Sequence, residues 1–587
     1  MKRSIALLLA LVMLLSLAAC AGKSNSDSTT PSTSTETNGT TESTDTADTS
    51  SEEVPDAASL VSDAFIDPIN DWDQYNTMID EIKAETDFAK RTELMHEAED
   101  VLMSNYCIIP LYYYNDIYML KDYVEGMYAN LFGTKFFQNV HMNNGSTTLR
   151  LNLASEPDFL DPALNSSVDG ACLAAASFSG LYTYNAEGHT EPACATGYTV
   201  SEDGLHFVVT LREGLKWSDG KDLTAKDFEF AWKRAASSEL GADYGYMFEV
   251  IKGYTADGSD PKAENLAVTA VDNKTLTVTL NNPVAYWNEL LAFPAYMPVR
   301  EDVVANEAWA TDPSTYIGNG PYTMTAWEHN SKITLTKNPY YHAVDKVTMD
   351  ELDFYLSDDA NNMLANFQKG DWQLIDDVPT SEIASLKEQY PTEFVVAGQI
   401  GTYYVCWNIN EEILPADLLA NMTPEEAEAA RAEVRQAIGL LFDRNYIVTE
   451  IGQAGQLPAS SFVPMGMTDA DGSEFYKNAG HVEGVTGYYD VTDDEDVYMA
   501  NFDKAVETLK KYYTYDEANG VFTNFPSLTY LYNTSEAHKA IGEYLQSAVS
   551  AVGITMNLNN QEWNTFLNTR KAGDYSIARN GWLADYN

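Results

Sequence analysis

The stretch from residue 198 to residue 228 constrains the fold most. Its apolar residues first alternate with polar ones on either side of a turn, and their spacing then changes from that of a strand to that of a helix. Two stretches within it have the alternation of β-strands, and Asp203-Gly204 between them is typical of a hairpin turn. Thr224 predicts the N-cap of a helix, with Asp227 three positions later. A hairpin followed by a capped helix indicates a protein that mixes β-sheet with α-helix.

Other stretches favour the same α/β class. We expect a second hairpin over residues 271–280, a half-buried strand over 149–153, and a helix capped by Thr423. The chain is 45% apolar and 12% aromatic, and about 530 of its 587 residues follow the N-terminal region. That length is enough for two or three domains with cores of their own.

The N-terminal region has the pattern of an exported lipoprotein. Residues 1–20 combine a basic start, an apolar run and the tetrad Leu-Ala-Ala-Cys, in which Cys20 is the expected site of lipidation. An ordinary secretory signal is the alternative. Residues 21–56 are rich in Ser and Thr and have no aromatic residue, so we expect a disordered tether. The body would then be held at the outer face of the cell membrane.

The charge and the cysteines limit the possible partners. A formal net charge of −53 makes nucleic acid and anionic lipid surfaces poor partners. After the signal, no second apolar run is long enough to span a membrane. Besides Cys20, the cysteines show no C-x-x-C pair, so we expect no metal and no cofactor. Cys172 and Cys194 are open to two interpretations, a disulfide or buried free thiols.

The last thirty residues look like the edge of a pocket. Two indoles, two guanidinium groups and a carboxylate recur at short intervals along them: Trp563, Arg570, Arg579, Trp582 and Asp585. A β-rich run from Tyr575 to Ala578 is expected to open into a turn at Gly581.

A helix and a strand are expected near the front of the body. Leu94, Ala98 and Val101 fall at helical spacing within residues 91–103. The apolar residues from 108 to 114 then predict a buried strand, in which the proline at position 110 suggests a sheet edge or a strand end.

These stretches resemble the oligopeptide-binding proteins that feed ABC importers, extracellular solute-binding protein family 5. The run V-S-E-D-G-L-H-F-V-V-T-L-R-E-G-L-K-W-S-D-G-K-D-L-T-A-K-D-F, residues 200–228, carries the resemblance most specifically, together with the last segment. The resemblance implies a two-lobed periplasmic-binding-protein fold of type II, in the three-subdomain peptide-binding class with mixed sheets. It also implies a monomeric, extracytoplasmic binding protein that is not an enzyme.

The order of the pieces differs from the family. Residues 91–142, with their R-x-x-L-x-x-x-A-E helix and I-P-L-Y-Y-Y strand, resemble the family's carboxyl-terminal end, whereas residues 149–162 resemble its mature amino terminus. We therefore expect a circular permutation, with the old ends joined at residues 143–146 and new ends opened after Asp585. A gene-model error or a remnant of tandem copies is the alternative.

The resemblance also assigns roles to particular residues. It implies that Asp585 holds a peptide's α-amino group and that the indoles of Trp563 and Trp582 wall pockets for side chains of any kind. Arg579, Arg570 and His538 match positions that meet the peptide's carboxylate. Val168 and Ala584 would supply main-chain contacts. On composition alone, surface carboxylates, core indoles and surface ion pairs are the more ordinary fates of such residues.

The family pattern can also carry a disulfide between the crossing strand and the residue after the second Trp. Gly401 and Leu583 occupy those places here, so that link is absent.

The expected domains follow from the resemblance and the permuted order. They are a lipoprotein signal (1–20), a tether (21–56), the permuted segment (57–145), lobe I (146–182 and 300–400), an extra subdomain (183–299) and lobe II (401–587). The expected function is capture of oligopeptides between the lobes and delivery to an ABC importer's membrane subunits. The alternatives are a binder of dipeptides, nickel or a glycan on the same fold and, from another class, a secreted hydrolase.

Overall fold

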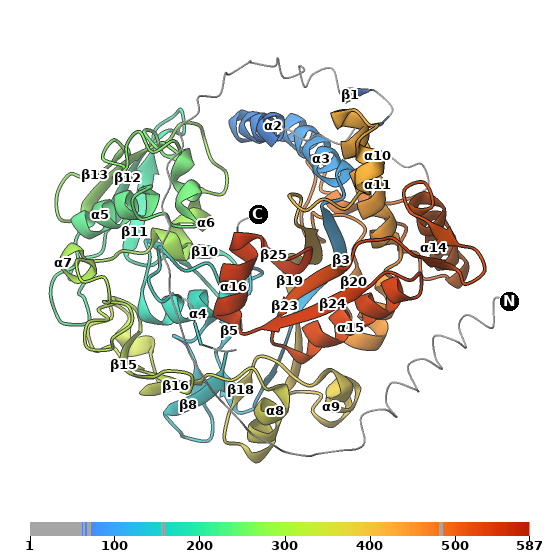
Figure 1. Ribbon diagram of the computed structural model, residues 1–587. Coiled ribbons are helices and arrows are strands. Elements are labelled where there is room, and N and C mark those ends of the chain that lie inside the picture. The colour runs from blue at the N-terminus through green and yellow to red at the C-terminus, as the bar shows by residue number, and fades with distance from the viewer. Residues whose placement is uncertain are drawn as a thin grey trace, which may run out of the picture. The chain divides into compact units, whose positions relative to one another are not determined.

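Two long antiparallel strands, β3 (Ile108–Leu120) and β19 (Phe394–Trp407), run side by side through the middle of the largest sheet (Figure 1). The computed structural model describes residues 61–62, 65–66, 72–153, 156–157, 159–480 and 485–585. The expected signal, the lipidation site Cys20 and the tether lie outside the described residues.

The largest sheet among the described residues has eleven strands, both parallel and antiparallel. Ten of them form one path in the order β15-β16-β17-β8-β18-β3-β19-β25-β23-β24, and β20 pairs with β3. Beyond β3 and β19, the strands are β15 (Tyr322–Glu328), β16 (Lys332–Lys337), β17 (Glu351–Tyr355), β8 (Thr148–Asn152), β18 (Leu374–Ile375), β25 (Ile577–Leu583), β23 (Leu528–Asn533), β24 (Met556–Gln561) and β20 (Leu457–Pro458).

A separate four-stranded sheet contains the two strands predicted within residues 198–211. Its order is β11 (Ala195–Val200), β12 (His206–Leu211), β14 (Thr275–Thr279) and β13 (Val268–Ala270), with antiparallel pairing throughout. Both predicted hairpins are therefore present. The predicted capping box of Thr224 and Asp227 begins α5 (Ala225–Ala236), and Thr423 with Glu426 caps α11 (Pro424–Leu440) in the same way.

The two long strands pass from one hydrophobic core to another. Ile109 and Leu111 of β3 are buried in a core shared with α11, α15 (Glu536–Ser550) and β23. Tyr118, further along the same strand, belongs to the core of the four-stranded sheet and β8. β3 and β19 therefore connect two independently packed bodies, which is the arrangement expected for two lobes joined by crossing strands.

The front segment is an integral part of this fold. Its helices α2 (Trp72–Ala84) and α3 (Phe88–Ser104) precede β3, and Asp87 caps α3 by accepting a hydrogen bond from the Lys90 amide. Ala98 and Val101 of α3 are buried, as their helical spacing predicts. Figure 1 shows α2 and α3 leading toward β3, in the blue part of the chain.

The structure corrects the expectation that β3 is an edge strand. β3 lies between β18 and β19, and Pro110 is its third residue, beside a register shift between Tyr403 and Tyr404 of β19. Proline has no amide hydrogen to donate, so it fits near the beginning of an interior strand where the ladder is irregular. The alternative reading of Pro110, a strand end, agrees with this position.

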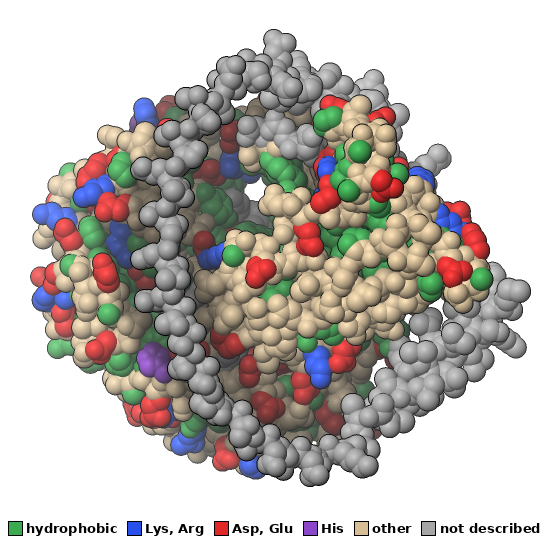
Figure 2. Space-filling view, in the orientation of Figure 1, with side chains coloured by type: hydrophobic (Ala, Val, Ile, Leu, Met, Phe, Trp, Pro, Cys, Tyr) green, Lys and Arg blue, Asp and Glu red, His purple; other side chains and the backbone are tan. Residues whose placement is uncertain are grey.

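The four cysteines in the described part of the chain are free thiols, and Cys107, Cys172 and Cys194 are buried. Of the two interpretations of Cys172 and Cys194, the structure has the buried thiols. Within the described ranges, no helix combines the length and the apolar character needed to cross a bilayer. On the face drawn in Figure 2, Asp and Glu side chains are scattered rather than gathered in one patch.

Candidate ligand-binding cavity

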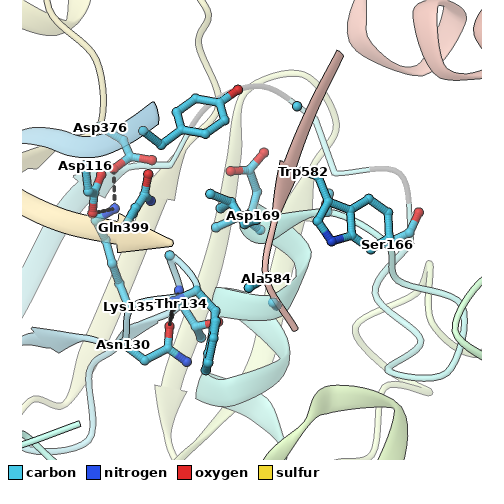
Figure 3. A pocket seen from close by; sticks show the side chains of 18 of the residues that line it. Asp116, Asn130, Thr134, Lys135, Ser166, Asp169, Asp376, Gln399, Trp582 and Ala584 are labelled. Carbon is cyan, nitrogen blue, oxygen red and sulfur yellow. Dashed lines mark hydrogen bonds and ion pairs between the residues drawn. The ribbon is translucent and has the colours of Figure 1, made fainter. Parts of the chain in front are cut away.

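A cavity of about 770 Å³ lies alongside β25 and takes residues from both cores (Figure 3). All eight residues that the sequence assigned to ligand binding line it: Val168, His538, Trp563, Arg570, Arg579, Trp582, Ala584 and Asp585. The structure therefore brings together residues more than 400 positions apart in the chain. Their roles toward a ligand stay predictions.

Strand β25 carries the centre of the site. It pairs antiparallel with β19, and Gly401 lies directly opposite Leu583. Gly581 lies inside this strand, so the expected turn at Gly581 is wrong. A Cβ at position 581 would approach the Tyr114 hydroxyl to 2.3 Å, so the glycine permits the close packing of β3's tyrosine against β25.

Asp585 stands just beyond the end of β25. The Tyr246 hydroxyl donates a hydrogen bond to Asp585 Oδ2 at 3.3 Å. Burial raises the pKa of the Asp585 carboxyl to about 6, while hydrogen bonds from Tyr246 and Tyr244 lower it. In the described part of the chain no cation lies within ion-pair distance of this carboxylate, so its charge is available to a ligand.

Arg579 lies on β25 among tyrosines. Its guanidinium carbon is 5.4 Å from the centre of the Tyr403 ring, and Tyr112, Tyr114 and Tyr530 surround it. Its Nε is buried without a hydrogen-bond partner. No carboxylate of the described residues forms an ion pair with Arg579. A desolvated cation of this kind is suited to bind an anion.

Two further basic side chains line the cavity with Arg579. Arg570, on α16 (Trp563–Ala572), donates a hydrogen bond from Nη1 to Asn580 Oδ1 at 2.7 Å. The Nδ1 of His538, on the first turn of α15, lies 3.3 Å from the Tyr403 hydroxyl. Burial and the charge of Arg579 hold the pKa of His538 well below its usual value. His538 is therefore neutral near pH 7 and can offer a carboxylate only a hydrogen bond.

The two indoles have different surroundings. Trp563 is the first residue of α16, stacks on Phe566 with ring centres 5.7 Å apart, and keeps its Nε1 buried without a partner. Trp582 is 45% exposed and presents its ring to the cavity, as Figure 3 shows. Val168 is the first residue of α4 (Val168–Ser177), whose N-cap is Ser167.

A group of charged residues at the lobe I side of the cavity was not predicted from the sequence. Lys135 Nζ lies 2.9 Å from Asp116 Oδ2 and 2.7 Å from Asp376 Oδ1, and its side chain is 3% exposed. Asp169, in the first turn of α4, lines the cavity beside them (Figure 3). These residues come from four separate segments, so no local spacing reveals them.

The cavity also contains residues that the sequence could have indicated. Tyr112, Tyr114 and Asp116 alternate along β3 and all line the cavity. Alternate residues of a strand share a face, so this tyrosine-rich stretch carried a period-two signal. It was interpreted only as a buried strand. Within the described residues, no group of three or more His, Cys, Asp and Glu side chains is arranged to hold a metal ion.

Two lobes joined by long strands, with a partly enclosed cavity lined from both, define a class of proteins that bind a small ligand rather than a macromolecular surface. Residues 189–587 match the model of "Bacterial extracellular solute-binding proteins, family 5 Middle". The chain belongs to this family of solute-binding proteins.

Relatives and solved structures agree with this assignment. The chain is 33% identical over 457 residues to the oligopeptide-binding protein OppA of Bacillus subtilis, covering 76% of each chain. It is 30% identical to the dipeptide-binding protein DppE of the same organism, covering 76% of this chain and 75% of DppE. The structure of Haemophilus influenzae OppA in complex with RPPGFSPFR is similar with a TM-score of 0.63 and 27% identity, covering 76% of this chain and 81% of that one.

Proposed function

We propose that the chain captures oligopeptides in the cavity and delivers them to the membrane subunits of an ABC importer. One observation carries the proposal: the cavity holds a guanidinium without an ion pair, Arg579 on β25, and a carboxylate without an ion pair, Asp585 just beyond the end of β25. A peptide with free ends supplies the two complementary charges, an ammonium and a carboxylate.

The geometry of β25 suits an extended ligand. From Arg579 to Leu583 the strand advances about 13 Å, at roughly 3.3 Å per residue. Asp585 follows two residues later. A peptide bound along this segment can therefore keep its amino group at Asp585 and direct its carboxylate toward Arg579, Arg570 or His538, according to its length. Trp563 and Trp582 would wall the spaces for its side chains, and Val168 and Ala584 would meet its backbone.

The named relatives support this choice of ligand. OppA of B. subtilis is an oligopeptide-binding protein, and the H. influenzae OppA structure holds a nine-residue peptide. DppE, a dipeptide-binding protein, favours dipeptides as the second candidate ligand. The proposed function involves no catalysis, since a binding protein only has to hold and release its ligand.

Native mass spectrometry tests the proposal. The protein without its signal, residues 21–587, is measured as purified and again after unfolding and refolding. We expect a heterogeneous peptide adduct that refolding removes and that added tri-, tetra- or penta-alanine restores. A length series that includes dialanine separates the two candidate ligands. A folded protein that takes up no peptide of any length would contradict the proposal.

The position of the protein in the cell belongs to the same proposal. Lipidation at Cys20 and the tether of residues 21–56 would hold a monomeric body at the outer face of the cell membrane. Metabolic labelling with a fatty-acid analogue, compared between the natural chain and Cys20→Ala, tests the anchor. Label retained by the Cys20→Ala chain would contradict it.

The permuted order of the chain is also a proposal. Its support is the central place of β3, which residues 57–145 insert between β18 and β19, and their contribution of Asp116 and Lys135 to the cavity. The front segment would thus complete the lobes that begin at residues 146–182 and continue through 183–299, 300–400 and 401–587.

A further inference from the structure

The lobe I side of the cavity carries more negative than positive charge. Asp116, Asp169 and Asp376 line it, and Lys135 is the cation among them. Burial alone would lower the pKa of Lys135, but Asp376 and Asp116 together raise it. The lysine is therefore fully engaged by two carboxylates and has little left to offer a third.

Asp169 is a carboxylate without a partner on the lobe I side of the cavity, whereas Asp377, which also lines the cavity, accepts a hydrogen bond from the Val378 amide. Among the described residues, no hydrogen bond or ion pair reaches its side chain, whereas Figure 3 draws the ion pairs of Lys135 to Asp116 and Asp376. Asp169 belongs to the first turn of α4, so its backbone is fixed by a helix with a Ser167 cap. Burial, followed by the charge of Asp376, raises the pKa of Asp169 to about 7, and Lys135 opposes the shift.

An unpaired carboxylate that faces a partly enclosed space is costly, because burial removes part of its water without supplying a counter-charge. Asp585 is the unpaired carboxylate just beyond β25, where the proposed function pairs it with the amino group of the peptide. The lining around Arg579 has unpaired positive charge and is suited to a carboxylate. A lysine or arginine side chain of a bound peptide would supply the missing cation at Asp169, and an acidic side chain would meet like charge.

We propose that Asp169 is a specificity-determining residue, which together with the Asp116–Lys135–Asp376 group selects peptides that carry a basic side chain at the position facing it. This inference rests on the proposed function and deepens it, because it names a chemical class of peptide. The selection is by charge, whereas the indole-walled spaces accept side chains without such preference.

The test compares peptides that differ in one side chain. The host is whichever of tri-, tetra- and penta-alanine binds most tightly, and each position in turn is replaced by lysine, by norleucine or by glutamate. Norleucine keeps the four-carbon chain of lysine and lacks its ammonium group. Titration calorimetry at pH 8, where Asp169 is ionised, gives the affinities for the natural chain and for Asp169→Asn. Asp122→Asn, an exposed residue that does not line the cavity, is the matched control.

At one peptide position we expect the natural chain and Asp122→Asn to bind lysine about tenfold or more tightly than norleucine. Asp169→Asn should bind the norleucine peptide normally and lose most of the preference for lysine. Peptide binding with no preference for lysine at any position, or a preference that Asp169→Asn retains in full, would overturn the inference and leave the proposed function intact. Absence of binding to every peptide would overturn both.

If Asp169→Asn does not fold, the ratio of lysine to norleucine affinities in the natural chain still decides. A second measurement then tests whether the preference depends on an ionised carboxylate. The pKa of Asp169 is about 7, and burial raises the pKa of the neighbouring Asp376 and Asp377 to about 6 and about 7, so the ratio should fall as the pH is lowered from 8 to 5.5. A ratio that is the same at both values would contradict the role of Asp169.

Discussion

The hydroxyl of Tyr246 donates a hydrogen bond to the carboxylate of Asp585 across 339 positions of the sequence. Tyr246 lies on the 3-10 helix of residues Gly245–Val250, which packs with the four-stranded sheet, while Asp585 follows β25 of the largest sheet. The tyrosine therefore fixes the orientation of the carboxylate from a different part of the fold. This contact, together with the burial of the carboxyl, distinguishes Asp585 from a free surface acid.

Asp585→Asn should weaken binding of peptides with a free amino terminus. Asparagine keeps the size and the hydrogen bond of the side chain but removes the charge that would pair with an ammonium group. Loss of one partner of a desolvated charge pair costs about 2 kcal/mol or more, so Kd should rise by about 30-fold or more. Calorimetry with tetra-alanine measures the change.

Acetylated tetra-alanine is the control for this prediction. It has no ammonium group, so its weaker binding should be nearly the same for Asp585→Asn and for the natural chain. Asp574→Asn removes an exposed charge outside the cavity and should change neither peptide's affinity. Equal losses for free and acetylated peptides would mean that Asp585 does not contact the amino group.

Tyr246→Phe should shift the pH dependence of peptide binding. Asp585 binds an ammonium group only when ionised, so affinity should fall as the pH drops through its pKa of about 6. The hydrogen bond from Tyr246 lowers that pKa, and its removal should move the midpoint to a higher pH. Tyr340→Phe, an exposed tyrosine outside the cavity, should leave the midpoint in place. An unchanged midpoint in Tyr246→Phe would contradict the coupling.

Arg579→Gln should weaken the binding of peptides with a free carboxylate and leave the binding of amidated peptides unchanged. The guanidinium has no carboxylate partner among the described residues, so its charge is free for the ligand. A loss of about 2 kcal/mol or more is expected for the free acid of the best-binding alanine peptide. Arg431→Gln is the control, since Arg431 pairs with Glu412 and Glu428 away from the cavity. Equal losses of affinity for the free-acid peptide and the amidated peptide would argue against a contact between Arg579 and the peptide's carboxylate.

The sequence predicted the local elements and the residues that share one segment. The Asp203-Gly204 turn, the Thr224 cap and the cluster from Trp563 to Asp585 are all local patterns, and each lies where it was expected. The prediction of a turn at Gly581 was wrong. A glycine is required there because Tyr114 approaches closely, and Tyr114 lies on a strand 467 positions earlier in the chain.

The charged group at lobe I could not be predicted for the same reason. Lys135, Asp116 and Asp376 come together only through the pairing of β3 with β18 and β19 and through the hairpin of β5 (Tyr128–Ala129) and β6 (Lys135–Phe136). In the sequence each is one of 88 acidic or 35 basic residues. Contacts of this range depend on the tertiary fold and leave no local spacing.

Lys135→Met should destabilise the protein strongly. The methionine replaces the apolar stem of the lysine but leaves the carboxylates of Asp116 and Asp376 buried without a counter-charge, which costs about 3–5 kcal/mol. Urea denaturation measures the loss, and adding Asp116→Asn should restore part of it. Lys332→Met removes a more exposed pair with Asp353 and should cost less. Equal losses for Lys135→Met and Lys332→Met would show that the buried group has no special role.

Cutting the chain between residues 143 and 146 should leave the two pieces bound to each other. Gly145 has a φ of +81° and no atom near its Cβ direction, so the turn has room for an inserted protease site. β3 pairs with β19 along most of its length and buries Ile109 and Leu111, so the front piece should stay in place without a covalent link. Size exclusion after cleavage should show one species that still binds peptide.

Substitutions at two leucines of the front piece distinguish the contribution of β3 to the association of the pieces from the contribution of the rest of the front piece. Leu111 is fully buried in β3, so Leu111→Asp should release the front piece after cleavage and abolish peptide binding. Leu131 is 50% exposed, so Leu131→Asp should leave the two pieces of the cut protein bound to each other. If the front piece separates from the natural sequence as soon as the turn is cut, residues 57–145 are an appendage, and the proposal that they complete the lobes fails.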